Sequence, residues 1–89
     1  MTSIEARAVL IPEIRDFIIR NFLFGQAAGT LKDDDSFLAG GIIDSTGVLE
    51  LIGFLEKQYG ITIENGELLP DNLDSVTKVA SFVRRKLGE

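Results

Sequence analysis

Two Asp-Ser pairs, Asp44-Ser45 and Asp74-Ser75, are the groups in this sequence best placed to do chemistry. Each follows a predicted loop and precedes a predicted helix, where a carboxylate or hydroxyl accepts hydrogen bonds from the free backbone N–H groups of the first helical turn. Helix capping is therefore the default interpretation of both pairs. Their surroundings differ, because the first pair opens an acidic helix and the second opens a basic one.

The sequence lacks the residues that most other catalytic and metal-binding sites require. The 89 residues include no cysteine and no histidine, which excludes disulfides, thiolate nucleophiles, thiolate metal sites and the commonest general base. The Asp33 to Asp35 triplet is no EF-hand, because Leu38 and Asp44 stand where that loop needs glycine and glutamate. We expect no catalytic residue and no metal site, so that the protein is not itself an enzyme.

The charge of the chain is unevenly distributed. The net charge is −5, yet residues 31–74 hold ten acidic and two basic residues, whereas the rest of the chain holds four acidic and seven basic residues. This acidic excess argues against nucleic acid as a partner, because lysine and arginine bind phosphate backbones. We expect protein partners whose basic patches meet the acidic segment.

Length and composition predict a single domain over residues 1–89. A chain this short has one core, and 45% hydrophobic with 26% charged residues is typical of a folded protein. A first amphipathic helix is predicted to end at Gly25 and to start near Pro12, which leaves residues 1–10 as a flexible or separate N-terminal turn. The alternative is an earlier helical turn from Ser3 that is kinked at Pro12. Its apolar face comprises Leu10, Ile11, Ile14, Phe17, Ile18 and Phe22.

Two further long helices and a short one follow a long connection. The connection spans residues 25–44, a second helix residues 45–59 with Gly60 as its stop, a short helical turn residues 67–73, and a last helix runs from Asp74 or Ser75 to Leu87. The fold class is therefore all-α, a small four-helix bundle with three longer helices and one short helix. The expected apolar anchors are Phe37, Leu38, Ile42 and Ile43 in the connection, and Val48, Leu49, Ile52, Leu55, Tyr59, Val76, Val79, Ala80, Val83 and Leu87 in the helices.

The sequence gives no sign of a membrane or export segment. No apolar run is long enough to cross a bilayer. The N-terminal residues include Glu5 and only one basic residue, Arg7, where a secretory signal has a basic patch and a long apolar stretch. We expect a cytoplasmic, monomeric protein.

The sequence from Asp44 onward resembles the acyl carrier protein family. Residues 44–51, Asp-Ser-Thr-Gly-Val-Leu-Glu-Leu, are similar to the family's Asp-Ser-Leu-x-x-x-Glu-Leu attachment motif, and Gly41 stands in for the glycine that precedes it. The similarity continues through residues 54–61. It resumes at residues 72–76, Asn-Leu-Asp-Ser-Val, where the family enters its last helix, and in all it covers residues 10–87.

The resemblance implies that Ser45 carries 4'-phosphopantetheine, which a phosphopantetheinyl transferase moves onto the hydroxyl from coenzyme A, making the chain a phosphoprotein. The arm then carries an acyl or aminoacyl group as a thioester, and a loading ligase and downstream synthases are further partners. Asp44, Thr46 and Gly41 belong to the attachment motif, in which Asp44 orients the hydroxyl or helps to hold the metal of the transferase. The positive end of the helix dipole favours a phosphodiester at this position.

The resemblance also implies a docking face and a cavity. Asp44, Glu50 and Glu56 would form an acidic face for basic patches on partner enzymes, which favours fast encounter over tight binding. A cavity sheltering the cargo would be lined by the apolar residues of the connection and by Val48, Leu49, Ile52, Leu55, Val79 and Val83. Core packing is the more frequent role of such residues.

Two departures from the family pattern leave the pathway open. Gly41 lies three residues before Asp44, where the family often has two, and Thr46 and Gly47 follow Ser45 where a larger apolar residue is usual. Gly47 weakens a helix by up to about 1 kcal/mol relative to alanine. Fatty acid, polyketide or nonribosomal peptide biosynthesis and a free-standing aminoacyl or peptidyl carrier all fit. A helical interaction domain without a prosthetic group is the alternative from a different class.

Overall fold

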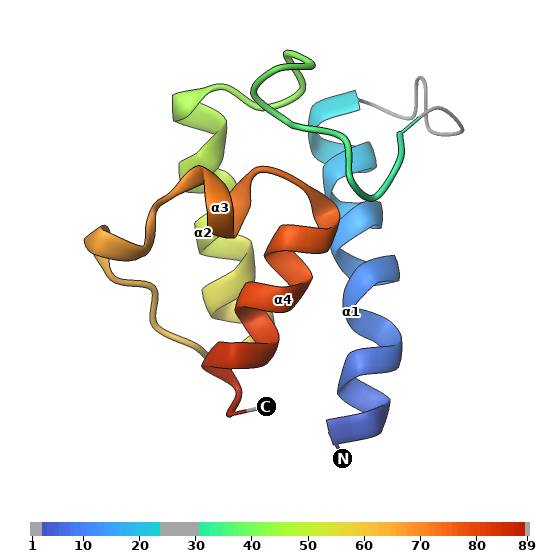
Figure 1. Cartoon of the computed structure of the whole chain (residues 1–89), viewed down its shortest axis with the longest axis vertical. Helices are drawn as coiled ribbons and strands as arrows, with labels where there is room; N and C mark the ends of the chain where they lie inside the picture. The colour runs from blue at the N-terminus through green and yellow to red at the C-terminus, as the bar shows by residue number, and fades with distance from the viewer. Residues whose placement is uncertain (1–2, 24–30, 89) are drawn as a thin grey trace.

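The computed structural model describes residues 3–23 and 31–88, with side chains from Leu10 onward. Four α-helices are present, and no strand occurs in these two ranges (Figure 1). The helices are α1 (Ser3–Ile18), α2 (Ser45–Tyr59), the short α3 (Pro70–Leu73) and α4 (Val76–Lys86), with a π-helical turn η1 (Ile19–Leu23) after α1 and a 3-10 turn η2 (Asn65–Glu67) before α3. The predicted all-α bundle is confirmed.

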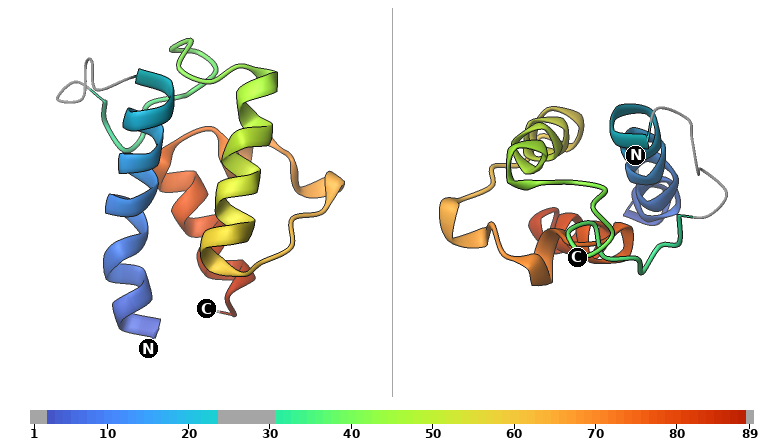
Figure 2. Two further views of the ribbon diagram at one scale, coloured as in Figure 1. Left: turned by 180° about the vertical axis from the view of Figure 1, so that it is seen from behind. Right: turned by 90° about the horizontal axis from the view of Figure 1, so that it is seen from above.

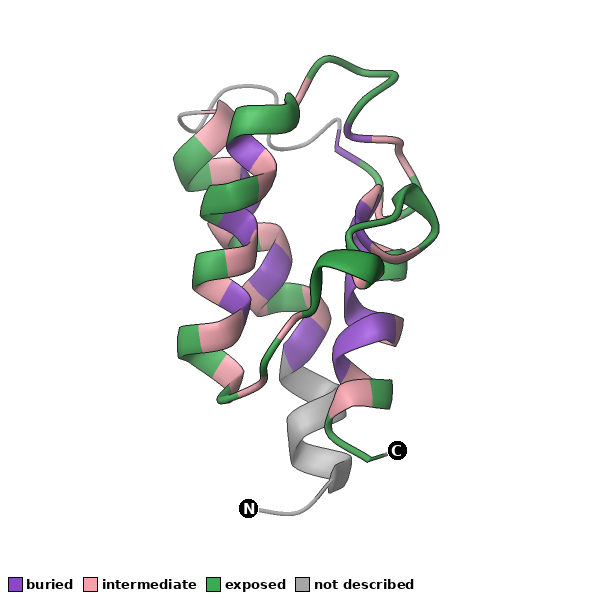
Figure 3. Cartoon of the chain, turned by 90° about the vertical axis from the view of Figure 1, so that its left-hand side faces the viewer, coloured by how far each residue is buried: buried purple, intermediate pink, exposed green. Residues whose placement is uncertain are grey.

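The three long helices enclose one core. Seen from above, α1, α2 and α4 lie around a shared interior, and the short α3 lies at its edge (Figure 2). The parts of the helices coloured as buried lie toward that interior, and the parts coloured as exposed lie on the outside (Figure 3). No helix in the described ranges is long and apolar enough to cross a membrane. The core consists of Leu10, Ile14, Ile18, Leu31, Phe37, Ile43, Leu51, Leu55, Leu73, Val76, Val79, Ala80, Phe82 and Val83.

The predicted start of the first helix near Pro12 is wrong. Helix α1 begins at Ser3 and continues through Pro12, whose side chain is exposed. A proline inside a helix costs about 3 kcal/mol, and here Leu10, Ile14 and Ile18 are all buried on the core face of the same helix. Packing of that face outweighs the local penalty. The predicted end at Gly25 lies outside the described residues.

The predicted bounds of the second helix are confirmed. Helix α2 runs from Ser45 to Tyr59, and Gly60 is its C-cap. Gly60 adopts a left-handed conformation (φ 67°) and donates its N–H to the Glu56 carbonyl. Helix α4 ends at Lys86, and Leu87 is its C-cap. Leu87 is exposed, so its predicted burial is wrong. The predicted interior position of Leu49 is also wrong, since this residue is 65% exposed.

Four buried apolar residues were missed, Leu31 in the connection, Leu51 on α2, Leu73 on α3 and Phe82 on α4. Leu51 and Leu55, four residues apart, form the buried stripe of α2, whereas Leu49 lies on the outward side. The apolar residues of α2 are too numerous for one face, so periodicity alone did not show which of them the bundle would cover.

The α1–α2 connection, of which residues 31–44 are described, is a packed turn and not an open loop. It passes over the start of α4 on its way to α2 (Figure 2). The predicted anchors Phe37 and Ile43 are buried, Ile42 packs partly against the core, and Leu38 is 51% exposed. The Phe37 carbonyl accepts hydrogen bonds from the Ile42 and Ile43 N–H groups at 2.8 and 3.3 Å.

Aromatic side chains connect α1 to α2. The Phe17 and Phe54 rings stack with centroids 4.1 Å apart, and the Tyr59 hydroxyl donates to Glu13 Oε1 at 3.0 Å. Burial of Tyr59, together with this contact to the Glu13 carboxylate, raises the pKa of the phenol above its ordinary value. These contacts fix the C-terminal half of α2 against α1.

Candidate functional site

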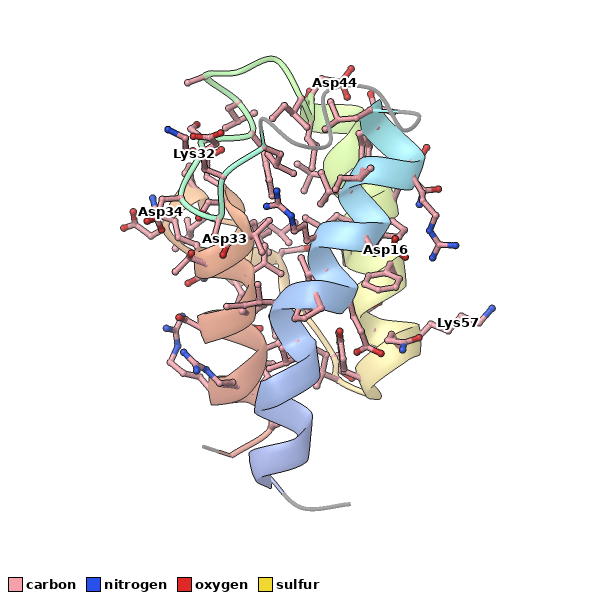
Figure 4. All side chains as sticks on the ribbon, turned by 90° about the vertical axis from the view of Figure 1, so that its right-hand side faces the viewer. Asp16, Lys32, Asp33, Asp34, Asp44 and Lys57 are labelled. Carbon is pink, nitrogen blue, oxygen red and sulfur yellow. The ribbon has the colours of Figure 1, made fainter. Side chains whose placement is uncertain are left out.

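The first Asp-Ser pair presents an exposed hydroxyl at the start of α2. Asp44 is the N-cap, and its Oδ1 accepts from the Gly47 N–H at 2.7 Å. Ser45 is the first helical residue and is exposed, and within the described ranges its hydroxyl makes no hydrogen bond. Figure 4 shows Asp44 at the end of the molecule where the connection enters α2. Capping is thus done by the aspartate, and the serine is left accessible.

The second pair is built into the fold. Ser75 is 2% exposed, and its Oγ accepts from the Lys78 N–H at 3.1 Å as the N-cap of α4. Asp74 points the other way, toward the connection, where its carboxylate accepts from the Leu38 N–H at 2.9 Å and from the Ser36 hydroxyl at 2.5 Å. Neither residue of this pair is available for modification.

An apolar cavity opens beside Ser45. Its volume is about 290 Å³, near the lower end of the range for small-molecule sites. Ser45, Val48 and Leu49 of α2 form one side of it. The other lining residues are Phe37, Leu38 and Ile43 of the connection and Leu68, Leu69, Pro70, Leu73 and Asp74 around α3. A group attached to the Ser45 hydroxyl therefore has an apolar space next to its point of attachment.

The predicted lining is correct only in part. Val48 and Leu49 contribute to the cavity, whereas Ile52, Leu55, Val79 and Val83 do not. The missed side of the cavity comes from α3 and the residues before it. The consecutive apolar residues Leu68 and Leu69, ahead of Pro70 at the start of a very short helix, were the available signal, because so short a helix leaves them little core to join.

Gly47 is favoured by the close approach of η1 to the start of α2. A Cβ atom at this position would lie 2.8 Å from Phe22 Cε1 and 3.0 Å from Ile43 Cγ2. Gly47 is buried accordingly. The glycine that looked like a weak point of the helix is thus the position at which the end of η1 packs against it, directly behind the exposed serine.

The other residues of the motif and the docking residues occupy different environments. Thr46 and Glu50 are exposed, and Gly41 adopts a left-handed conformation with φ 68° in the turn before α2. Glu56 is half-buried, and its Oε2 accepts from the Ile63 N–H at 2.9 Å. Glu50 shares the outward side of α2 with Leu49, while Glu56 contacts the segment that leaves the helix.

The Asp33 to Asp35 triplet has structural contacts. Arg15 on α1 pairs with Asp33 at 3.1 Å and donates to the Leu31 carbonyl, and Asp35 Oδ2 accepts from the Lys32 N–H at 2.9 Å. Figure 4 shows Asp33 and Asp34 on the connection, well away from Asp44. Among the described residues no group of three or more acidic side chains is arranged to hold a metal ion.

The chain is similar to known carrier proteins. D-alanyl carrier proteins of Streptococcus pyogenes, from serotype M5 (strain Manfredo), serotype M49 (strain NZ131) and serotype M1, are each 35% identical to it over 72 residues. The alignment covers 79% of this chain and 90% of each relative. No protein-family model and no solved structure matches the chain. The chain belongs to the carrier protein family, whose prosthetic group is covalently bound 4'-phosphopantetheine.

Proposed function

We propose that Ser45 is the attachment residue and that the protein carries an acyl or aminoacyl group as a thioester between biosynthetic enzymes. The observation that supports this most strongly is the contrast between the two serines that start helices. Ser45 is exposed at the rim of an apolar cavity, whereas Ser75 is buried and uses its oxygen as a cap. A transferase can reach only the first of these hydroxyls without unfolding α4.

The attachment reaction needs little from this chain. The Ser45 Oγ–phosphorus bond forms as the phosphoanhydride bond of coenzyme A breaks, adenosine 3',5'-bisphosphate leaves with the bridging oxygen, and the hydroxyl proton goes to a base on the transferase. Asp44, fixed by its bond to the Gly47 N–H, stands next to the hydroxyl and can orient it or hold the transferase's metal ion. When bound, the arm supplies the thiol that this cysteine-free chain lacks.

Two observations bear on the cargo. The relatives are named D-alanyl carrier proteins, which favours an aminoacyl group. The apolar cavity beside Ser45 favours an apolar acyl chain, because a buried amino group would lose its hydration. The mass of the group on protein purified from its own cell decides between the two.

We propose that partners dock on the surface around Ser45, formed by Asp44, Glu50 and the exposed leucines of the cavity rim. Candidate partners are the phosphopantetheinyl transferase, a loading ligase and downstream synthases, met in the cytoplasm by a single domain of residues 1–89. Glu56 was assigned to this surface by resemblance, and its contact with the Ile63 N–H makes it the least accessible of the three acidic residues. Charge reversal at Glu50 should therefore slow loading more than charge reversal at Glu56.

Intact-mass spectrometry tests the attachment. The protein is co-expressed with a phosphopantetheinyl transferase as wild type, Ser45→Ala and Ser75→Ala. We expect wild type and Ser75→Ala to gain the mass of one phosphopantetheine and Ser45→Ala to gain none. An unmodified wild type, or a modified Ser45→Ala variant, would overturn the proposal.

A further inference from the structure

We infer that Asp74 is a positioning residue that fixes one wall of the cavity beside Ser45 and thereby sets how well that cavity encloses the carried group. The inference rests on the proposed function, in which the group is attached at Ser45. This wall is the turn of residues 36–39 in the α1–α2 connection. The side chain of Leu38, within the turn, lines the cavity.

The Asp74 carboxylate contacts two residues of this turn, Ser36 and Leu38. Oδ2 accepts from the Ser36 hydroxyl at 2.5 Å and Oδ1 accepts from the Leu38 N–H at 2.9 Å. The Ser36 Oγ in turn accepts from the Ala39 N–H at 3.0 Å, so a single carboxylate organises the whole turn. The backbone carbonyl of Asp74 adds a third contact by accepting from the Phe37 N–H at 2.8 Å.

Asp74 itself is held by the helices on either side of it. Its N–H donates to the Pro70 carbonyl at 3.0 Å, which ends α3, and the buried cap Ser75 follows it directly. The carboxylate therefore projects from a fixed point of the bundle toward a turn that lies outside the helices. A shift of the turn has to break contacts to Asp74, whereas Asp74 cannot follow the turn.

Loss of the carboxylate should loosen the wall without unfolding the connection. Phe37 and Ile43 stay buried on the core, and the Thr77 N–H still donates to the Asp33 carbonyl at 2.9 Å. Leu38, by contrast, is 51% exposed and has its backbone N–H bound only by the Asp74 carboxylate among the described residues. The side chain that moves most is thus one that lines the cavity.

The test measures how fast water reaches a sheltered thioester. Wild type, Asp74→Ala and Ser36→Ala are loaded by a phosphopantetheinyl transferase with octanoyl- or acetyl-coenzyme A, and thioester hydrolysis is followed by intact mass. Asp71→Ala, which removes an exposed carboxylate from α3, is the matched control. We expect the octanoyl thioester to hydrolyse several-fold faster on Asp74→Ala, less so on Ser36→Ala, and unchanged on Asp71→Ala.

The acetyl thioester reports on effects other than enclosure, because its cargo is too short to fill the cavity. Its hydrolysis should be the same on all four proteins. Equal octanoyl rates on wild type and Asp74→Ala would overturn the inference, as would equal acceleration of both thioesters. If Asp74→Ala fails to melt cooperatively by circular dichroism, Ser36→Ala decides the matter by the same criterion.

Failure of the proposed function gives a different result. In that case wild type acquires no mass at all, and the wall is tested on the unmodified proteins with the apolar dye 1-anilinonaphthalene-8-sulfonate. We expect its affinity for Asp74→Ala to differ several-fold from that for wild type and Asp71→Ala. Equal affinities for all three would overturn the role of Asp74 independently of Ser45.

Discussion

The two Asp-Ser pairs have identical sequences and each stands at the start of a helix, but they are offset by one residue relative to the helix and divide the same duties in opposite ways. In the first pair Asp44 caps the helix and Ser45 is exposed. In the second pair Ser75 caps the helix and Asp74 binds a distant turn. The dipeptide sequence alone therefore does not determine its function. The function depends on what packs over it, and only the second pair lies beneath the α1–α2 connection.

The largest effect that tests this comparison should come from Gly47, the position at which η1 packs against the start of α2 behind the first pair. Gly47→Val places a side chain where even a Cβ meets Phe22 at 2.8 Å, so we expect the free energy of unfolding to fall by about 1–3 kcal/mol. Urea denaturation measures it. Gly53→Val on the same helix is the matched control, because its Cβ has open space and its stability should hardly change.

A further variant shows whether the contact itself is responsible. Adding Phe22→Leu to Gly47→Val should recover part of the lost stability, since the shorter side chain leaves room for the new methyl groups. Additive losses in the double variant would show that Gly47 is needed for another reason.

The next effect separates the two serines by stability instead of by modification. Ser75→Ala removes a buried cap and should cost about 1 kcal/mol, within the range for caps in proteins. Ser45→Ala removes an exposed hydroxyl and should change the unfolding free energy by less than about 0.5 kcal/mol. Thermal or urea unfolding compares them directly. Equal losses would mean that the two hydroxyls have equal structural roles and would contradict the comparison.

The reciprocal variants address the first aspartate. Asp44→Ala should destabilise α2 by about 1 kcal/mol because the Gly47 N–H loses its acceptor, and Asp44→Asn should restore most of the stability because an amide oxygen also caps. Both are measured by urea unfolding of the unmodified protein. If the asparagine variant also loads slowly while remaining stable, the charge of Asp44 matters to the transferase beyond capping.

The smallest effect concerns the segment that leads into the second pair. The hydrogen bond from the Glu64 N–H, with the ion pair to Lys86, holds the pKa of the Glu67 carboxyl below its ordinary value. Because the pKa of Glu67 is lower in the folded protein than in the unfolded chain, where it is near 4.5, the ionised carboxylate stabilises the fold at pH values above 4.5. This stabilisation is lost as the pH falls through the pKa of the folded state. Lys86→Met should therefore cost slightly more stability at pH 7 than at pH 3. An equal cost at both pH values would contradict this sign.

Local signals predicted the helices of this molecule better than their packing. The bounds of α2 followed from a cap and a stop glycine, Asp44 and Gly60, which act within one turn. The start of α1 did not, because burial of Ile14 and its neighbours outweighs the proline, and burial depends on the whole bundle. The proposed attachment residue, Ser45, followed from its motif. The cavity wall did not, because Asp74 and Leu38 are 36 residues apart in sequence.

The contacts of the α1–α2 connection have a consequence for amide hydrogen exchange. The N–H groups of Phe37, Leu38, Gly40, Ile42 and Ile43 all have acceptors, although none lies in a helix. Exchange from such groups requires an opening reaction, so the segment should be protected to a degree that is unusual for a connection and closer to that of the neighbouring helices. The α1–α2 connection would then form a cooperative unit with the start of α4, and the two would open together.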